Sequence, residues 1–355
     1  MASSKEAKKR LDLIITKSRI HLYKPIQIAE ILFHHRSDPS FNLNKLESYR
    51  TRSKRWRDEI TQKLVGRVST SSARFQDNIF EQNAMPPEFL SALGKENEAK
   101  PMGIVEAYIY AKLEKRFDTV NSIISYIFHA TPNSFNLREL IDKFISEPGL
   151  RRSIDKSFEI VSYSLFNALI DHLETTVTLE TSPSKTSLLN EFEDFAKTVL
   201  GLSPKTPKLT SAAHIFRAGV TNAADRGLDI WSNFGPAIQI KHVTLGEESA
   251  SDIIGQVAEN ARIIVVCKKA EAKVIHNVLK QVGARKVQGI VTQDDLEKWY
   301  AKCLKGKYAK TIGKDVLKYL KAEFLTEFPS AGTVLKTFVK ERDYDKILLK
   351  GKWRA

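Results

Sequence analysis

The sequence predicts a mixed α/β fold, in which a largely helical N-terminal region precedes an αβββαβ core whose mixed sheet is flanked by helices. Two observations support this prediction. Apolar residues follow helical spacing through most of the chain up to residue 200, whereas short apolar strands alternate with helices from about residue 212. With 355 residues and 42% hydrophobic content, the chain can build two or three domains with ample cores.

The N-terminal region is predicted to consist of helices. Residues 5 to 35 are interpreted as helical with a break near Pro25, because proline is tolerated in the first turn of a helix. Further helices are predicted at 42–67, 103–117 and 137–150.

One more helix is predicted before the sheet. Its apolar residues at helical spacing are Leu188, Phe192, Phe195 and Val199, and Gly201 follows directly after its end. Segments rich in Pro, Ser and Thr at 182–187 and 201–211 are interpreted as the connections on either side.

Strands and helices alternate in the C-terminal part. Apolar segments predict strands at 213–220, 228–232, 237–243, 262–268 and 287–292. Helices are predicted at 249–260 and along an apolar stripe from Val274 to Val282, and a Thr292-x-x-Asp295 capping pattern opens another. The lysine-rich tail is interpreted as a mixture of helix and loop.

The formal net charge of +14 indicates the kind of partner. Residues 1–75 hold 17 basic and 7 acidic residues, residues 76–190 hold 11 and 16, and residues 191–355 hold 28 and 19. The surplus therefore lies at both ends of the chain. Such a surplus attracts polyanions, and nucleic acid is favoured over a membrane surface because no long basic amphipathic helix stands out.

Several classes of protein are excluded. No apolar run approaches the length of a membrane span, and the N-terminal apolar patch, broken by Asp12, is too short for a secretory signal, so a cytoplasmic protein is expected. Cys267 and Cys303 are interpreted as small core residues, since two cysteines cannot form a disulfide framework or a Cys-rich zinc site. His34 and His35 are adjacent rather than spaced as metal ligands.

A dense basic run lies within the helix predicted at 42–67. Two interpretations remain open, namely contact with DNA phosphates and a solvated helix face. The residues interpreted as DNA-binding are Arg50, Arg52, Lys54, Arg55 and Arg57.

Two polar residues interrupt an apolar strand. Gln239 and Lys241 lie among Ile238, Ile240 and Val243, where β-branched and aromatic residues are usual. Residues two apart in a strand project from the same face, so Gln239 and Lys241 point together. A polar partner is therefore expected beside them.

Asp229 is the expected partner. If its strand forms an antiparallel hairpin with the next, Asp229 shares their face when it opposes Gln239 or Lys241, with residue-number sums of 468 or 470. That register requires a loop centred on Phe234 or Gly235, which the Asn-Phe-Gly-Pro segment allows.

An aspartate, an amide oxygen and a lysine on one open sheet face suit phosphodiester hydrolysis. Carboxylate and amide oxygens are ligands for Mg²⁺, for which Mn²⁺ is expected to substitute. The metal would polarise the phosphate, while the ammonium group of Lys241 would position the attacking water and offset charge on phosphorus.

These residues carry a family resemblance. Asp229, followed after nine residues by Gln239-Ile240-Lys241, resembles the PD-(D/E)XK nuclease core in its Gln-x-Lys variant, over about residues 191 to 300. Together with "DRGLDIW" and "IQIKH", the segments "RIHLYKPIQIAEIL" and "NAMPPEFLSALGKEN" extend the likeness to most of the chain, which resembles the HaeII family of type II restriction endonucleases.

The resemblance implies a role for each residue of the hairpin. Asp229 corresponds to the metal-binding acid, Lys241 to the catalytic lysine, and Gln239 to a position usually held by Glu or Asp. A neutral amide binds a divalent cation less well than a carboxylate, so another acid is expected to compensate. Glu193, on the helix before the core, is the first candidate and Asp225 the second; a solvated helix residue and a turn residue are the respective alternatives.

The resemblance further implies a Mg²⁺-dependent enzyme of a restriction system, which cuts double-stranded DNA at a short palindrome built around GCGC and acts as a homodimer. We divide the chain into a basic helical DNA-binding region (1–75), a helical region (76–190), a nuclease core (191–305) and a basic C-terminal extension (306–355). A non-catalytic DNA-binding protein, or a nuclease of the same fold acting on junctions or modified DNA, is the alternative.

Overall fold

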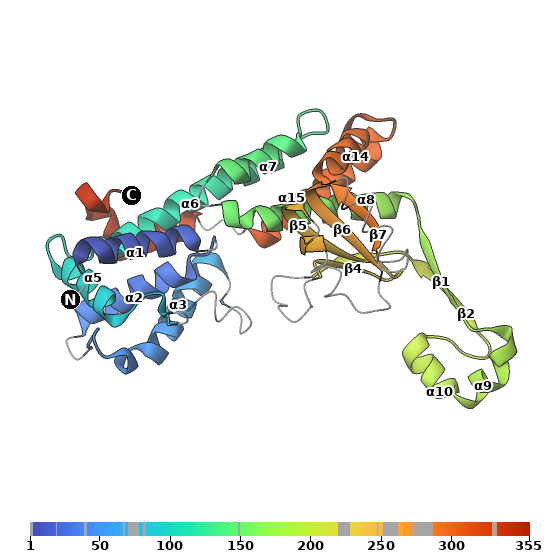
Figure 1. Ribbon diagram of the computed structural model, residues 1–355, viewed down its shortest axis with the longest axis horizontal. Helices are drawn as coiled ribbons and strands as arrows, with labels where there is room; N and C mark the ends of the chain where they lie inside the picture. The colour runs from blue at the N-terminus through green and yellow to red at the C-terminus, as the bar shows by residue number, and fades with distance from the viewer. Residues whose placement is uncertain are drawn as a thin grey trace.

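The computed structural model is a mixed α/β protein with a helical N-terminal part and a five-stranded mixed sheet (Figure 1). This confirms the α/β class predicted from the sequence. The described residues are 3–18, 20–38, 41–66, 68–69, 78–80, 83–147, 150–218, 228–246, 248–250, 262–271, 274, 287–328 and 332–355.

The N-terminal part is a bundle of helices around one core. Its helices are α1 (Ser4–Lys17), α2 (Tyr23–Ser37), α3 (Arg50–Val65), α5 (Pro87–Glu98) and the first half of α6 (Ile104–His129). The break predicted near Pro25 is confirmed, because α1 ends at Lys17 and Pro25 lies in the first turn of α2. The chain returns to this bundle at its C-terminal end, where α16 (Gly332–Glu341) and Trp353 join the same core.

The second half of α6 belongs to another core, so this long helix connects the two parts of the molecule. Within the described residues, four more helices lie near the sheet on that side: α7 (Leu137–Ser146), α8 (Ile154–His172), α14 (Gln293–Lys305) and α15 (Lys314–Glu327). A reciprocal capping box between Thr292 and Asp295 begins α14, as predicted.

The sheet has the strand order β3-β4-β5-β6-β7. The strands are β3 (Ile215–Arg217), β4 (Ile230–Ser232), β5 (Ala237–Leu245), β6 (Ile263–Ala270) and β7 (Val287–Thr292). The pairs β3–β4 and β4–β5 are antiparallel, and the pairs β5–β6 and β6–β7 are parallel. All five predicted strands are confirmed, and the helices predicted at 249–260 and from Val274 to Val282 lie almost entirely outside the described residues.

The sheet is apolar on both faces. One face packs with α8 and α15 through isoleucines that include Ile230, Ile238 and Ile240. Val265 and Cys267 belong to a smaller cluster with Leu245. Both cysteines are buried, as expected for core residues, and burial raises the pKa of the Cys267 thiol to about 11.

A projecting segment, which we call the arm (residues 173–212), lies between α8 and β3 (Figure 1). It is a two-stranded ribbon of β1 (Thr176–Glu180) and β2 (Lys208–Ala212), closed by α9 (Thr186–Glu191), α10 (Glu193–Phe195) and a π-helical turn (Ala196–Leu200). Part of the segment interpreted as a connection at 201–211 therefore pairs in a strand. The predicted helix is present, and Gly201 ends it with a φ of 70°.

The main cores do not follow the order of the chain. The bundle core combines residues between 7 and 117 with residues between 335 and 353. Hence the end of the predicted C-terminal extension, from α16 onward, packs with the N-terminal helices, whereas its α15 packs with the core that holds the sheet. No helix in the described ranges has the length and apolar character needed to cross a membrane.

Candidate active site

The β4–β5 hairpin has a register that brings the predicted site residues together. Ile230 lies opposite Ile238, which is a residue-number sum of 468, one of the two predicted values. The same register, continued by one residue, sets Asp229 opposite Gln239. Gly235 has a φ of 116° in the turn, a conformation that favours glycine.

The carboxylate of Asp229 is bound to the strand that carries the lysine. Its Oδ2 accepts a hydrogen bond of 2.7 Å from the backbone N–H of Ile240, the residue between Gln239 and Lys241. The backbone N–H of Asp229 donates to the carbonyl of Ile238 at 3.1 Å. Asp229 is thus fixed beside the Gln239-Ile240-Lys241 segment from both its backbone and its side chain.

The face is open at one end and covered at the other. Gln239 is 2% exposed, Asp229 is half-buried, and Lys241 is exposed. No residue in the described part of the chain forms an ion pair or hydrogen bond with the ammonium group of Lys241. The expectation of a wholly open face is therefore met at Lys241 and not at Gln239.

Burial and nearby charge act in opposite directions on Asp229. Burial is the largest effect and raises the pKa of the carboxyl group, since the charged form loses hydration. The N–H of Ile240 and the ammonium groups of Lys156 and Lys241 lower that pKa. A carboxylate held in this way gains from any further positive charge that binds beside it.

Helix α8 contributes charged residues that the sequence analysis did not identify. Oδ1 of Asp155 accepts a 3.0 Å hydrogen bond from the backbone N–H of His242 on β5. Glu159 is almost fully buried, pairs with Lys156 and Arg217, and has a pKa raised mainly by burial. A lone glutamate inside the apolar run of α8 was the available signal, because buried acids are rare without a partner.

Of the two acids expected to compensate for Gln239, the structure describes one, and that one is not part of this group. Glu193 lies on α10 in the arm, is half-buried, and forms a 2.8 Å ion pair with Lys197. Asp225 lies outside the described residues. Two described acids of α8 interact electrostatically with Asp229. Asp155 raises the pKa of Asp229, and Asp229 raises the pKa of Glu159.

The basic run lies on α3, and its side chains differ in how exposed they are. Arg52 and Arg55 are exposed, and Arg55 pairs with Glu59 at 2.8 Å on the same helix. Arg50 pairs with Glu47 at 3.2 Å, and Lys54 is half-buried. The side chain of Arg57 is 7% exposed. Four of the five residues can therefore reach solvent, whereas Arg57 is part of the bundle.

A metal ion at the hairpin would find oxygen donors. Asp229 offers the carboxylate oxygen that does not bond Ile240, and Gln239 offers an amide oxygen. Within the described ranges, no three residues of the types His, Cys, Asp and Glu are grouped to hold a metal ion. Few protein ligands, all of them oxygen, fit a hard cation such as Mg²⁺, which retains several waters.

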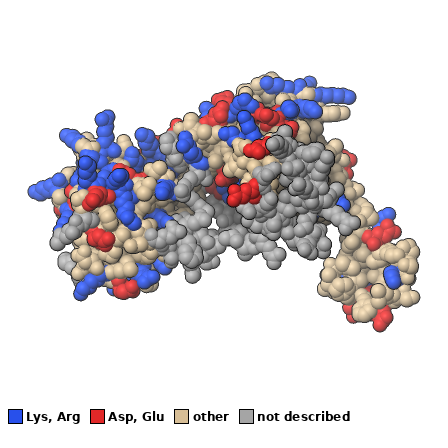
Figure 2. Space-filling model, viewed as in Figure 1, with Lys and Arg blue, Asp and Glu red and all other residues tan. Residues whose placement is uncertain are grey.

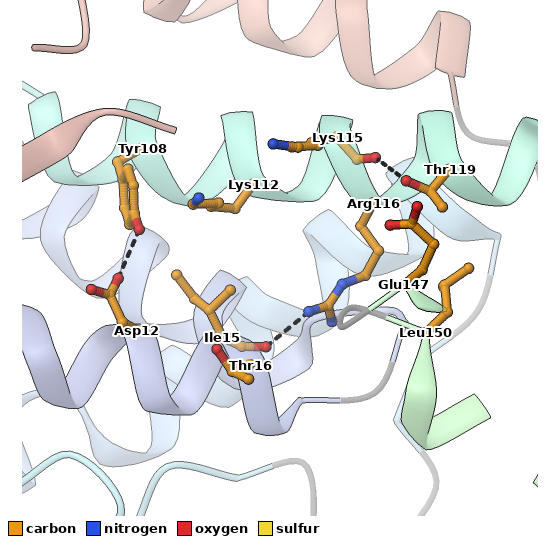
Figure 3. Close-up of a pocket in the computed structure, with 10 residues that line it drawn as sticks. All are labelled: Asp12, Ile15, Thr16, Tyr108, Lys112, Lys115, Arg116, Thr119, Glu147 and Leu150. Carbon is orange, nitrogen blue, oxygen red and sulfur yellow. Dashed lines mark hydrogen bonds between the residues drawn. The ribbon is translucent and has the colours of Figure 1, made fainter. Parts of the chain in front are cut away.

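A cavity of about 520 Å³ lies apart from the hairpin, between α1 and α6 (Figure 3). Arg116 donates to the carbonyl of Ile15 and so caps the end of α1, and the hydroxyl of Tyr108 donates to Asp12. These bonds join the two helices. The cavity therefore belongs to the contact between these two helices of the bundle.

Comparison with known proteins gives the chain its family. A family model described as "HaeII restriction endonuclease" matches residues 7–344. The chain is 48% identical to "Type II restriction enzyme HaeII" of Haemophilus aegyptius over 96% of its length and 97% of that protein. It is also 48% identical to "Type II restriction enzyme NgoBI" of Neisseria gonorrhoeae, with the same coverage. No solved structure matches.

The class that these findings define is the type II restriction enzyme, an endodeoxyribonuclease. Within that class, the chain belongs to the HaeII restriction endonuclease family. The resemblance drawn from the sequence is confirmed at this level.

Proposed function

We propose that this chain is a cytoplasmic, Mg²⁺-dependent endonuclease that hydrolyses double-stranded DNA at a short palindrome containing GCGC, and that its active site is the β4–β5 hairpin of a PD-(D/E)XK-like core. The hydrogen bond from Ile240 N–H to Asp229 Oδ2 carries this assignment, because it joins the acid to the lysine-bearing strand. The antiparallel β3-β4-β5 unit followed by parallel β6 supports the core assignment.

Asp229 and Gln239 would hold the divalent cation. When bound, such a cation polarises the scissile phosphate. Gln239 contributes no charge, so Asp229 carries the main electrostatic attraction, and the nearby carboxylates of Asp155 and Glu159 add negative potential. Because Gln239 is buried, the site would bind the cation at the junction between the buried and exposed ends of the hairpin.

Lys241 acts on the reacting groups. Its ammonium group is free of described protein partners, so it can donate a hydrogen bond to the attacking water and another to a phosphate oxygen. Water gives up a proton to solvent and adds to phosphorus, the bond from phosphorus to a deoxyribose oxygen breaks, and that oxygen takes up a proton from solvent. In the transition state, negative charge builds on the phosphate oxygens. A fixed positive charge next to these oxygens stabilises the transition state more than the substrate.

The basic surfaces supply binding. Figure 2 shows lysines and arginines gathered over the helical bundle and over the α14 end of the molecule. The exposed arginines of α3 add to this charge, and we assign them to phosphate contacts that give affinity without sequence information.

Palindromic cutting requires two active sites related by a two-fold axis, so we propose that the enzyme is a homodimer. A digest tests the function. Plasmid carrying GCGC-containing sites is incubated with the protein in Mg²⁺, in Mn²⁺ and in EDTA. Discrete bands in either metal and none in EDTA are expected. A smear would favour an enzyme acting on junctions or modified DNA, and intact plasmid that is nonetheless bound would favour a non-catalytic DNA-binding protein.

A further inference from the structure

The arm has more apolar surface than it can bury. Along β1 and β2 no residue is fully buried, and the large apolar side chains buried in the tip are those of Leu189 and Leu202. A two-stranded ribbon with so small a core is marginal in water by itself. The arm therefore lacks the internal packing that would explain its extended form.

The tip carries four large apolar side chains that are exposed and follow helical spacing in the sequence. The stripe consists of Leu188, Phe192, Phe195 and Val199, whose exposed fractions are 51, 53, 54 and 62%. On the ribbon, Leu179 and Leu209 lie opposite each other and are also exposed. Contiguous exposed apolar residues of this size usually mark an interaction surface.

We propose that the arm is a dimerisation arm, and that its apolar stripe packs against a second copy of this chain. This inference rests on the proposed function in one respect, since palindromic cutting is what calls for a second copy.

The charge of the arm argues against DNA as the occupant. Residues 173–212 contain four basic and five acidic residues, in a chain whose net charge is +14. Figure 2 shows the tip mostly uncharged, unlike the bundle. An uncharged apolar surface does not attract phosphates, whereas aromatic and aliphatic side chains are enriched at the centres of protein interfaces.

The exposed area approaches what a stable dimer needs. An enclosed phenylalanine buries about 150–250 Å², so a half-exposed one still offers on the order of 100 Å². With the smaller Leu188 and Val199, the two phenylalanines offer somewhat less than about 400 Å² per chain, and two copies somewhat less than about 800 Å². The ribbon leucines and a polar rim extend this toward the about 1,600 Å² of a standard interface.

The position of the arm also fits a second copy. A five-residue antiparallel strand spans about 17 Å, which sets the tip well away from the sheet in Figure 1. An element that reaches outward cannot bury its stripe on its own chain. A two-fold axis gives each copy an equivalent arm, so one sequence feature serves both chains.

Sedimentation of the full chain tests the proposal. The wild type and Phe192→Asn/Phe195→Asn are compared over a wide range of concentrations, with Phe128→Asn, 47% exposed on α6, as the matched control. We expect the wild type to be a dimer and the control to dimerise with the same dissociation constant. For the double variant, the dimer dissociation constant should be at least about 100-fold larger. In a second variant, Asn-Gly replaces the residues between Glu180 and Lys208, and it should also be monomeric and folded.

Each other outcome is decisive. A monomeric wild type, or a double variant that dimerises like the wild type, overturns the proposal; so does a variant that stays dimeric but loses DNA binding, which would make DNA the occupant. Cleavage is measured on the same preparations. A double variant that dimerises like the wild type and cuts its site rejects the arm and keeps the proposed function. A wild-type dimer that cuts no DNA, together with a monomeric double variant, keeps the arm and rejects the function.

Discussion

The N-terminal bundle and the β4–β5 hairpin both bury ionisable groups, but they leave them in different states. In the bundle, Glu30 is 1% exposed and accepts two hydrogen bonds from Arg342, at 2.8 and 2.9 Å. Arg36 and Glu106 pair similarly at 2.9 Å. At the hairpin, Asp229 accepts a hydrogen bond from the backbone N–H of Ile240, and the nearby Lys241 is exposed. The charges of the bundle are paired with each other and stabilise the fold. The charged groups of the hairpin still have hydrogen-bonding atoms that can bind a ligand.

The largest effect that we expect is on catalysis. Lys241→Ala should lower the cleavage rate by at least about 10³-fold, because a charge placed at the transition state is removed, while the protein stays folded. The rate is measured in Mg²⁺ with enzyme in excess. Lys269→Ala removes an exposed lysine of the neighbouring strand β6 and should cut at the wild-type rate. A Lys241→Ala protein that cuts within a few fold of the wild type would assign Lys241 to the surface.

The bundle network should respond in stability rather than in chemistry. Arg342→Met leaves Glu30 buried without its cation and should lower the free energy of unfolding by about 3–5 kcal/mol. Glu30→Gln/Arg342→Met removes both charges and should recover part of that loss. Urea unfolding measures the effect, and the cleavage rate per folded molecule should not change. Equal stabilities for the single and double variants would show that the pair is not a closed unit.

The pH dependence of cleavage tests the role of Asp229 at the β4–β5 hairpin. The ammonium group of Lys156 lowers the pKa of Asp229, so Lys156→Gln should raise that pKa and keep the carboxyl group protonated to a higher pH. The acid limb of the cleavage profile should therefore move to higher pH, by less than about one unit for a half-exposed partner. An acid limb that stays in place, or moves to lower pH, would separate Asp229 from the titrating group.

The smallest effect concerns the basic run on α3. Arg52→Gln/Arg55→Gln removes two exposed charges and should lower the salt slope of DNA binding by about 2, one for each phosphate contact. Lys185→Gln/Lys205→Gln, on the arm, is the matched control and should leave the slope unchanged. An unchanged slope in the α3 variant would show that this helix presents only a solvated face.

The register of the hairpin could be predicted because strands have a period of two, so Asp229 could share a face with Gln239 and Lys241 at only two residue-number sums. The contribution of α8 could not be predicted, since the contact between Asp155 and His242 depends on tertiary packing of distant segments. Helical spacing likewise predicted the helix that carries Phe192 without indicating that it lies in a projecting arm. The spacing of apolar residues thus predicts individual helices and strands. Which surfaces pack against them depends on the whole fold.

Single-turnover cleavage by Asp229→Asn tests most directly whether the hairpin is the active site. The asparagine keeps an oxygen that can accept the bond from Ile240 N–H, so the fold should survive while the negative charge is lost. We expect no cleavage above background in Mg²⁺, with the thermal midpoint and DNA binding in Ca²⁺ retained, and wild-type cleavage by Asp294→Asn on the exposed side of α14. Cleavage by Asp229→Asn within a few fold of the wild type would place the active site elsewhere in the chain.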